Sequence, residues 1–149
     1  MRVVIQRVSQ AKVEIGNQTI GQIDAGLLVY LSVGNGDNID DCQFIADKLS
    51  SVRIFEDDTG KMNRSVREAG GSLLIISNFT LHGDCRKGRR PSFDNAAEPQ
   101  SAKELYEKVI ELIASKGLKV EKGIFGENMQ VSSLNNGPVT ILLDSKRLF

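Results

Sequence analysis

The sequence predicts an α+β fold in which a largely antiparallel, curled and barrel-like β-sheet packs with two amphipathic helices. Roughly seven or eight short segments show the apolar runs or the alternation typical of strands, and most follow one another directly. Only two segments, near residues 38–51 and 99–117, repeat apolar residues at helical spacing. The length of 149 residues, with 40% hydrophobic and 26% charged residues, suits one domain spanning residues 1–149.

The N-terminal half is expected to form a hairpin, a covered strand and the first helix. Gly16-Asn17 is a two-residue turn signal between alternating segments. Residues 27–33 are apolar on both faces, which is typical of a central strand. Asp37 or Asn38 is suited to cap the helix, because either side chain accepts hydrogen bonds from free N–H groups. The strands expected here cover residues 2–8, 12–15, 18–23, 27–33 and 53–55.

The C-terminal half is expected to hold a buried strand, an irregular segment, the second helix and three more strands. Residues 82–98 lack a periodic pattern, and such long segments in compact domains are usually functional or mobile. The second helix begins near Pro99 and ends before Gly117. A sheet of this kind has an exposed edge, which dimerisation is one way to cover. The strands expected here cover residues 72–79, 119–125, 129–134 and 139–143.

Composition and motifs exclude several classes of protein. The 19 Lys and Arg residues balance the 19 Asp and Glu residues, and no apolar run approaches the roughly 20 residues of a membrane span. Cys42 and Cys85 are expected as free thiols in a reducing cytoplasm. His82, the single histidine, is expected at the surface after a strand end, and no serine lies in a nucleophile elbow. We therefore expect no metal site and no cofactor.

Three stretches are candidates for a functional site. SNFTL, at 77–81, ends a buried strand with hydroxyl and N–H groups suited to line a cleft and form an oxyanion hole. NNGPVT, at 135–140, places a proline between two strand-like segments. Each stretch alone also has a simple structural interpretation: a strand end, a tight hairpin turn or a solvated loop. The third stretch is a basic cluster suited to phosphates, made of Arg86, Lys87, Arg89 and Arg90.

SNFTL and NNGPVT closely resemble the two signature motifs of the bacterial-type D-aminoacyl-tRNA deacylases. The resemblance runs in order, at family-like spacing, from the first residues to about Leu143. One residue departs from the pattern: Asn78 stands where the family usually has glutamine, so the amide reaches one methylene less far. The other segments that resemble the family lie at 5–8, 60–63, 87–93 and 129–132.

The resemblance implies a cytoplasmic hydrolase that proofreads translation. It implies cleavage of the ester of D-aminoacyl-tRNA, and of glycyl-tRNA mischarged on tRNA-Ala, with release of free tRNA. In that family a Gly-cisPro motif of one subunit of a homodimer enters the partner's pocket and rejects L-amino acids. The tRNA 2′-hydroxyl is thought to assist catalysis, and no cofactor is needed. The partners implied are tRNA and a second copy of the chain, with no membrane.

The same resemblance assigns roles to individual residues. Phe79 and Thr80 are the catalytic residues, which line the adenosine and ester pocket and offer N–H groups to the oxyanion. The basic cluster is expected to contact tRNA phosphates. The residues assigned to substrate binding and to the chiral gate are Gly137, Pro138, Ser77, Asn78, Asn136 and Arg7.

Two other functions stay open at this point. One is a related proofreading deacylase, with a trans Gly-Pro bond, that removes wrongly attached L-alanine. Phe79 and the intact NGPVT pattern favour the D-specific branch over it. The other is a non-catalytic nucleic-acid-binding module, which would bind RNA or DNA in a salt-dependent way without cleaving an ester.

Overall fold

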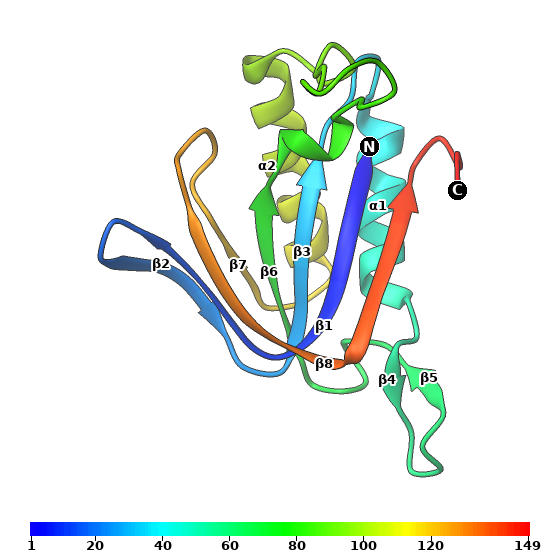
Figure 1. The fold of residues 1–149 in the computed structure, drawn as a ribbon. Coiled ribbons are helices and arrows are strands. Elements are labelled where there is room, and N and C mark those ends of the chain that lie inside the picture. Colours follow the sequence, from blue (N-terminus) through cyan, green and yellow to red (C-terminus); the bar gives the residue numbers. More distant parts are fainter.

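The computed structural model of the chain describes residues 1–149 and contains one six-stranded sheet, a two-stranded hairpin and two α-helices (Figure 1). Neither α-helix is long and apolar enough to cross a membrane. In chain order the elements are β1 (Arg2–Ile15), β2 (Gln18–Ile23), β3 (Gly26–Ser32), α1 (Ile39–Ser51), β4 (Phe55–Glu56), β5 (Met62–Arg64), β6 (Ser72–Ser77), the 3₁₀ turn η1 (Phe79–His82), α2 (Pro99–Ser115), β7 (Val120–Lys122) and β8 (Gln130–Asp144).

β1 organises the sheet, because it pairs antiparallel with three neighbours. Its residues 2–8 pair with β3, its residues 11–15 pair with β2, and β8 runs along its other edge. The sheet curls so far that β2 approaches β7: a Cβ atom on Gly21 would lie 3.0 Å from the carbonyl oxygen of Lys122. This curled, barrel-like sheet with two helices confirms the predicted fold class (Figure 1).

The parallel part of the sheet departs from the expectation that hairpins join most strands. β3, β6 and β7 lie side by side in parallel. α1 and the small β4–β5 hairpin lie between β3 and β6 in the chain, and α2 lies between β6 and β7. Parallel neighbours need a crossover connection, which is usually a helix. The helices therefore both connect and cover the strands, and the sheet is mixed.

Both faces of β3 and β6 are buried, as the apolar run at 27–33 predicts. Alternate residues of a strand point to opposite faces of the sheet. Leu27, Val29 and Ile75 pack with both helices in a core cluster of 20 buried residues. Leu28 and Leu74 belong to a second cluster of 7 buried residues, which β1 and β2 complete. The two strands that lead to the candidate site are thus fixed from both sides.

Local signals set the ends of both helices. Asn38 caps α1, because its side chain accepts the Asp40 N–H at 2.8 Å and its own N–H donates to the Asp41 carboxylate at 2.9 Å. Pro99 begins α2. Gly117, with a φ of +79°, follows α2 in the left-handed conformation that ends many helices.

The start of β3 tolerates no side chain. A Cβ atom on Gly26 would lie 1.9 Å from the carbonyl oxygen of Ser72 in β6. We predict that Gly26→Ala lowers the free energy of unfolding by about 3 kcal/mol, because two core strands must separate. Urea unfolding followed by circular dichroism measures this change, with the exposed Thr19→Ala as control. A loss below about 1 kcal/mol, the typical effect of a point mutation, would contradict the close approach.

Candidate active site

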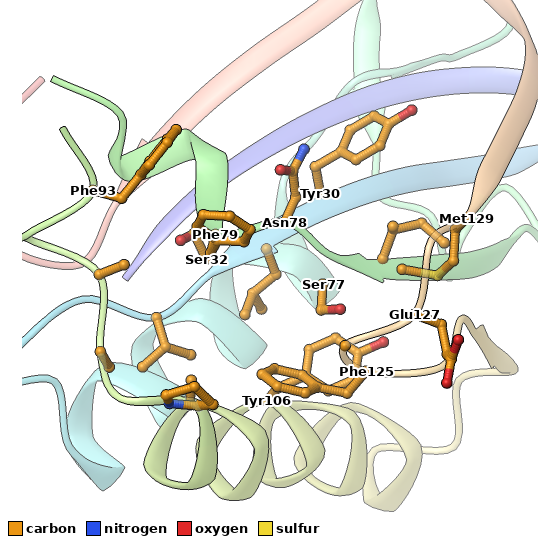
Figure 2. Close-up of a pocket in the computed structure, with 18 of the residues that line it drawn as sticks. Tyr30, Ser32, Ser77, Asn78, Phe79, Phe93, Tyr106, Phe125, Glu127 and Met129 are labelled. Carbon is orange, nitrogen blue, oxygen red and sulfur yellow. The ribbon is translucent and has the colours of Figure 1, made fainter. Parts of the chain in front are cut away.

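A pocket of about 600 Å³ opens beside the carboxyl ends of the parallel strands β3 and β6 (Figure 2). Ligands of open α/β sheets commonly bind at the carboxyl ends of the strands. The walls come from the ends of β3 and β6, the start of α2 and the segment that leads into β8. Of the 20 residues that line the pocket, 13 are hydrophobic, which is typical of a ligand-binding site with a few polar groups for orientation.

Aromatic rings and polar side chains reach the pocket from different elements. Phe79 of η1 is 60% exposed and meets Phe93 edge to face, with 5.1 Å between the ring centroids. Figure 2 shows this pair on one side of the pocket and Met129 on the other. The rings can hold a flat apolar group while polar atoms bind its edges. The lining side chains that carry polar atoms, including two tyrosines counted among the hydrophobic residues, are Tyr30, Ser32, Ser77, Asn78, Glu98, Tyr106 and Glu127.

The SNFTL stretch turns at the end of β6 and forms one wall of the pocket. The Asn78 N–H donates to the Leu31 carbonyl at 2.8 Å, which fixes this turn against β3. The Thr80 hydroxyl donates to the side-chain oxygen of Asn78. The N–H groups of Phe79 and Thr80 enter no loop or turn hydrogen bond, because the first turn of a helix leaves its leading donors free. Ser77, Asn78 and Phe79 line the pocket, whereas Thr80 does not.

The NNGPVT stretch forms a wide bulge within one strand. Val8 of β1 pairs with Asn135 of β8, but Gln6 pairs with Thr140, so a single β1 residue faces residues 136–139. The alternative interpretation of this stretch as a tight hairpin turn is wrong, because the expected strands on either side of it both pair with β1. That pairing partner lies at the other end of the chain, so the local sequence does not reveal it.

Arg7 is the β1 residue that faces this bulge, and its guanidinium connects the bulge to the start of the β4–β5 hairpin. Nε donates to the Asn136 carbonyl at 3.1 Å, and Nη1 donates to the Ile54 carbonyl at 2.7 Å. The Glu56 carboxylate lies 3.6 Å from Nη2. Arg7 is only 6% exposed, so its planar group of donors is held in one position. The Gly137–Pro138 peptide beside it is cis, and both residues are exposed.

The predicted site residues therefore fall into two separate groups. Ser77, Asn78 and Phe79 belong to the pocket, with Thr80 hydrogen-bonded beside it. Arg7 and residues 136–138 belong to the bulge, and none of them lines the pocket of the same chain. The family resemblance assigns the two groups to one site formed between two subunits, and a single chain keeps them apart.

The basic cluster is exposed beyond η1. Arg86 is occupied by a fork-shaped ion pair with Asp84, at 2.6 Å, and this guanidinium lowers the pKa of Asp84 to about 2. Lys87, Arg89 and Arg90 are exposed and form no ion pair, so their charges are free for an anion.

Several pocket residues were outside the sequence prediction. Tyr30 and Met129 are single large residues in segments that read as ordinary strand or loop, and only the fold turns them toward the pocket. Ser32 and His82 contact each other, with 2.6 Å between Oγ and Nδ1, although 50 positions separate them. The expectation of a surface His82 is wrong, because its side chain packs under η1 and the residue is only 6% exposed.

The buried cysteine and the buried pocket tyrosine offer no activated nucleophile. Burial raises the pKa of the Cys42 thiol to about 11, so this thiol is neutral near pH 7. Burial also raises the pKa of Tyr106, whose hydroxyl donates to the Ile75 carbonyl at 2.8 Å. No group of three or more His, Cys, Asp and Glu side chains is placed to hold a metal ion.

Solved structures share this arrangement of strands and helices. One, named c-Myc DNA Unwinding Element Binding Protein, is 34% identical with a TM-score of 0.91, over 97% of this chain and 98% of that one. Another, a probable eukaryotic D-amino acid tRNA deacylase, has a TM-score of 0.80 over 95% and 97% of the two chains. At 17% identity, the second likeness is one of fold.

Sequence comparison identifies the family. A family model described as D-Tyr-tRNA(Tyr) deacylase matches residues 4–144. Proteins named D-aminoacyl-tRNA deacylase from Thermotoga petrophila and Fervidobacterium nodosum are 56% and 55% identical over 149 residues, which is 100% of this chain and of each relative. This chain belongs to the D-Tyr-tRNA(Tyr) deacylase family.

Proposed function

We propose that this chain hydrolyses the ester between a D-amino acid and the 3′-terminal ribose of tRNA, releasing free tRNA and the D-amino acid. The observation that carries this proposal is 56% identity, over the full length, to a protein named D-aminoacyl-tRNA deacylase. We extend the activity to glycyl-tRNA mischarged on tRNA-Ala, since glycine has no side chain for a chiral gate to reject. Its place is then translation quality control in the cytoplasm, where charged tRNA is used.

The pocket beside η1 is our proposed site for the terminal adenosine and the ester. Its volume of about 600 Å³ lies in the range for small-ligand pockets. Phe79, which is largely exposed at the rim, offers a ring face to the base. Ser77 and Asn78 support the wall behind it and offer hydrogen bonds to the ribose or the ester. Asn78 also orients the Thr80 hydroxyl, a contact that its short amide allows.

Hydrolysis requires water to attack the ester carbonyl while the bond to the ribose oxygen breaks. The free N–H groups of Phe79 and Thr80 are our candidates for the oxyanion donors. An aminoacyl ester is already activated, so orientation and charge stabilisation supply much of the required rate. We assign the proton transfer to the neighbouring 2′-hydroxyl of the tRNA. The one histidine supports this assignment, because His82 is buried and bound to Ser32.

Chiral selection is assigned to the bulge acting across a homodimer. Gly137 and Pro138 are exposed and lie outside the pocket of their own chain, so a second copy is needed to bring them to a pocket. Exposed leucines along β8, Leu134 at 55% and Leu142 at 56%, offer apolar surface for such a contact. A rigid backbone wall near the α-carbon would exclude L side chains and accept many D side chains.

The whole of residues 1–149 acts as one domain in this proposal, with tRNA and a second copy of the chain as partners. The two core clusters support a single domain, because adjacent residues of β3 and β6 contribute to both. The mechanism calls on no cofactor and no membrane.

Activity and chirality are tested together with matched D- and L-tyrosyl-tRNA. We expect rapid hydrolysis of the D form while the L form stays charged. Phe79→Ala and Thr80→Ala should slow the D reaction, Phe79→Ala by about 100-fold if its position sets an oxyanion donor. Full activity in both variants would contradict the assignment of residues.

The same assay separates the other candidate functions. Cleavage of L-alanyl-tRNA would favour the related alanine-specific deacylase. Binding of tRNA or DNA without cleavage would favour a nucleic-acid-binding module, which the name of the 34%-identical structure also suggests.

The cross-subunit gate is tested with heterodimers purified through two different tags. A Cβ on Gly137 would lie 2.9 Å from the Val139 nitrogen, so Gly137→Ala disturbs the bulge, while Phe79→Ala disturbs the pocket. With one change on each subunit, one intact site remains per dimer, and about half of the activity should survive. With both changes on the same subunit, the activity should be lost. The reverse pattern would show that the bulge serves its own pocket.

The basic cluster is tested through the salt dependence of tRNA binding. Removing one of the free charges, as in Arg89→Ala or Arg90→Ala, should weaken binding and reduce the log–log salt slope by about 1. Lys119→Ala is the matched control, because this exposed lysine precedes β7, at the opposite end of the parallel strands from the pocket. Equal effects of the control and the test variants would exclude a specific role for the cluster.

A further inference from the structure

We propose that the hydrogen bond between Ser32 and His82 positions η1 against β3 and so places the N–H groups of Phe79 and Thr80. In this assignment His82 is a positioning residue, which acts on the site through η1 and not on the substrate. The role of those N–H groups rests on the proposed deacylase function. The hydrogen bond and its effect on η1 are properties of the free protein.

The pair lies between two walls of the pocket. Ser32 is the last residue of β3, lines the pocket and is 2% exposed. His82 is the last residue of η1 and the only buried residue in that element. The distance of 2.6 Å between Ser32 Oγ and His82 Nδ1 joins the strand to the turn (Figure 2 shows Ser32 behind Phe79).

Apart from the hydrogen bond between Asn78 and Leu31 at its start, η1 has few attachments that fix its orientation. Its internal hydrogen bonds include Leu81 N–H to the Asn78 carbonyl at 3.3 Å, a long bond typical of weak 3₁₀ geometry. Phe79 contributes little burial, since it is 60% exposed. The Arg2 side chain donates to the Leu81 carbonyl at 3.1 Å from one side. The buried imidazole supplies the contact on the side of the pocket.

The fold leaves a close-fitting space for this imidazole. A Cβ atom on Gly34 would lie 2.7 Å from His82 Nε2, so the ring packs directly on the backbone that follows β3. This hydrogen bond between buried partners therefore gives η1 a second attachment to β3, at the opposite end of the turn from the bond between Asn78 and Leu31.

Charged groups around the ring favour its neutral form. Burial lowers the pKa of His82, and the positive charges of Arg2 and the amino terminus lower it further. The carboxylates of Asp37 and Asp144 act in the opposite direction. The unfolded chain therefore binds a proton at a higher pH than the folded chain. Below the ordinary value near 6.5, the folded arrangement loses stability as the pH falls toward the lowered pKa.

The first test uses hydrogen exchange of the η1 amides in the free protein, which needs no substrate. His82→Leu keeps a large apolar side chain but removes the hydrogen bond, and we expect about fivefold lower protection at Leu81 and Gly83, whose N–H groups are hydrogen-bonded in the turn; fivefold is the worth of one such bond. His82→Asn places an amide near the position of Nδ1 and should restore most of the protection. Lys119→Ala is the control. Unchanged protection in His82→Leu would overturn the proposal.

The second test asks whether the pair acts as a unit. Ser32→Ala should lower protection at Leu81 and Gly83 as His82→Leu does, and the double variant should be no worse than either single variant. Additive losses would mean that each side chain acts separately, and would overturn the pairing. On D-tyrosyl-tRNA, the loss should appear in kcat more than in KM, because substrate contacts remain.

The pH dependence provides a third test, which uses the wild-type protein and needs no destabilised variant. Protection of Leu81 and Gly83 in the wild-type protein should fall, relative to the amides of α1, as the pH drops below the ordinary histidine value near 6.5, and His82→Asn should abolish this fall. A pH-independent wild type would overturn the proposal even if His82→Leu does not fold. If the wild type shows no deacylase activity, the proposed function fails, and the exchange measurements still decide the role of the pair.

Discussion

The pairing of β1 on both edges is the constraint on which the rest of the molecule depends. Fourteen consecutive residues run from Arg2 to Ile15, and they fix the register of β2, β3 and β8 at once. A one-residue slip in any pair would turn its apolar residues away from the core. β3 pairs in parallel with β6, and β6 pairs in parallel with β7. The pocket lies beside the carboxyl ends of β3 and β6. The same strand presents Arg7 to the bulge, so pocket and bulge share one reference element.

The two candidate groups are held by different kinds of force. The pocket depends on packing, since β3 and β6 are buried on both faces and α2 covers the rest. The bulge has left the ladder and depends instead on directed hydrogen bonds, from Arg7 to Asn136 and from Val139 to Asn135. Hydrogen bonds to a charged donor are worth more than neutral ones, which suits a segment without a core of its own. Substitutions should therefore damage the two groups by distinct routes.

The sequence predicted most accurately what is decided locally. The start of α1 depends on Asn38 and the residues just after it, so it was predicted within one residue. The family motifs led to the right family, and it was the resemblance, not any local pattern, that assigned the second motif to the pocket of another copy. His82 appeared to be a surface residue because its partner, Ser32, is 50 positions away. The parallel order of β3, β6 and β7 and the continuity of β8 likewise depend on partners distant in sequence.

The free edge of β8 creates a hazard that the bulge reduces. β8 pairs only with β1, so the backbone groups of its other edge are unpaired, and exposed leucines lie beside them. Strands of unrelated chains can pair with such an edge. Residues 136–139 interrupt that edge at its middle, because they leave the ladder and Pro138 has no N–H to donate. The bulge therefore divides one long edge into two short ones. The same four residues lower the tendency of this edge to recruit unrelated strands.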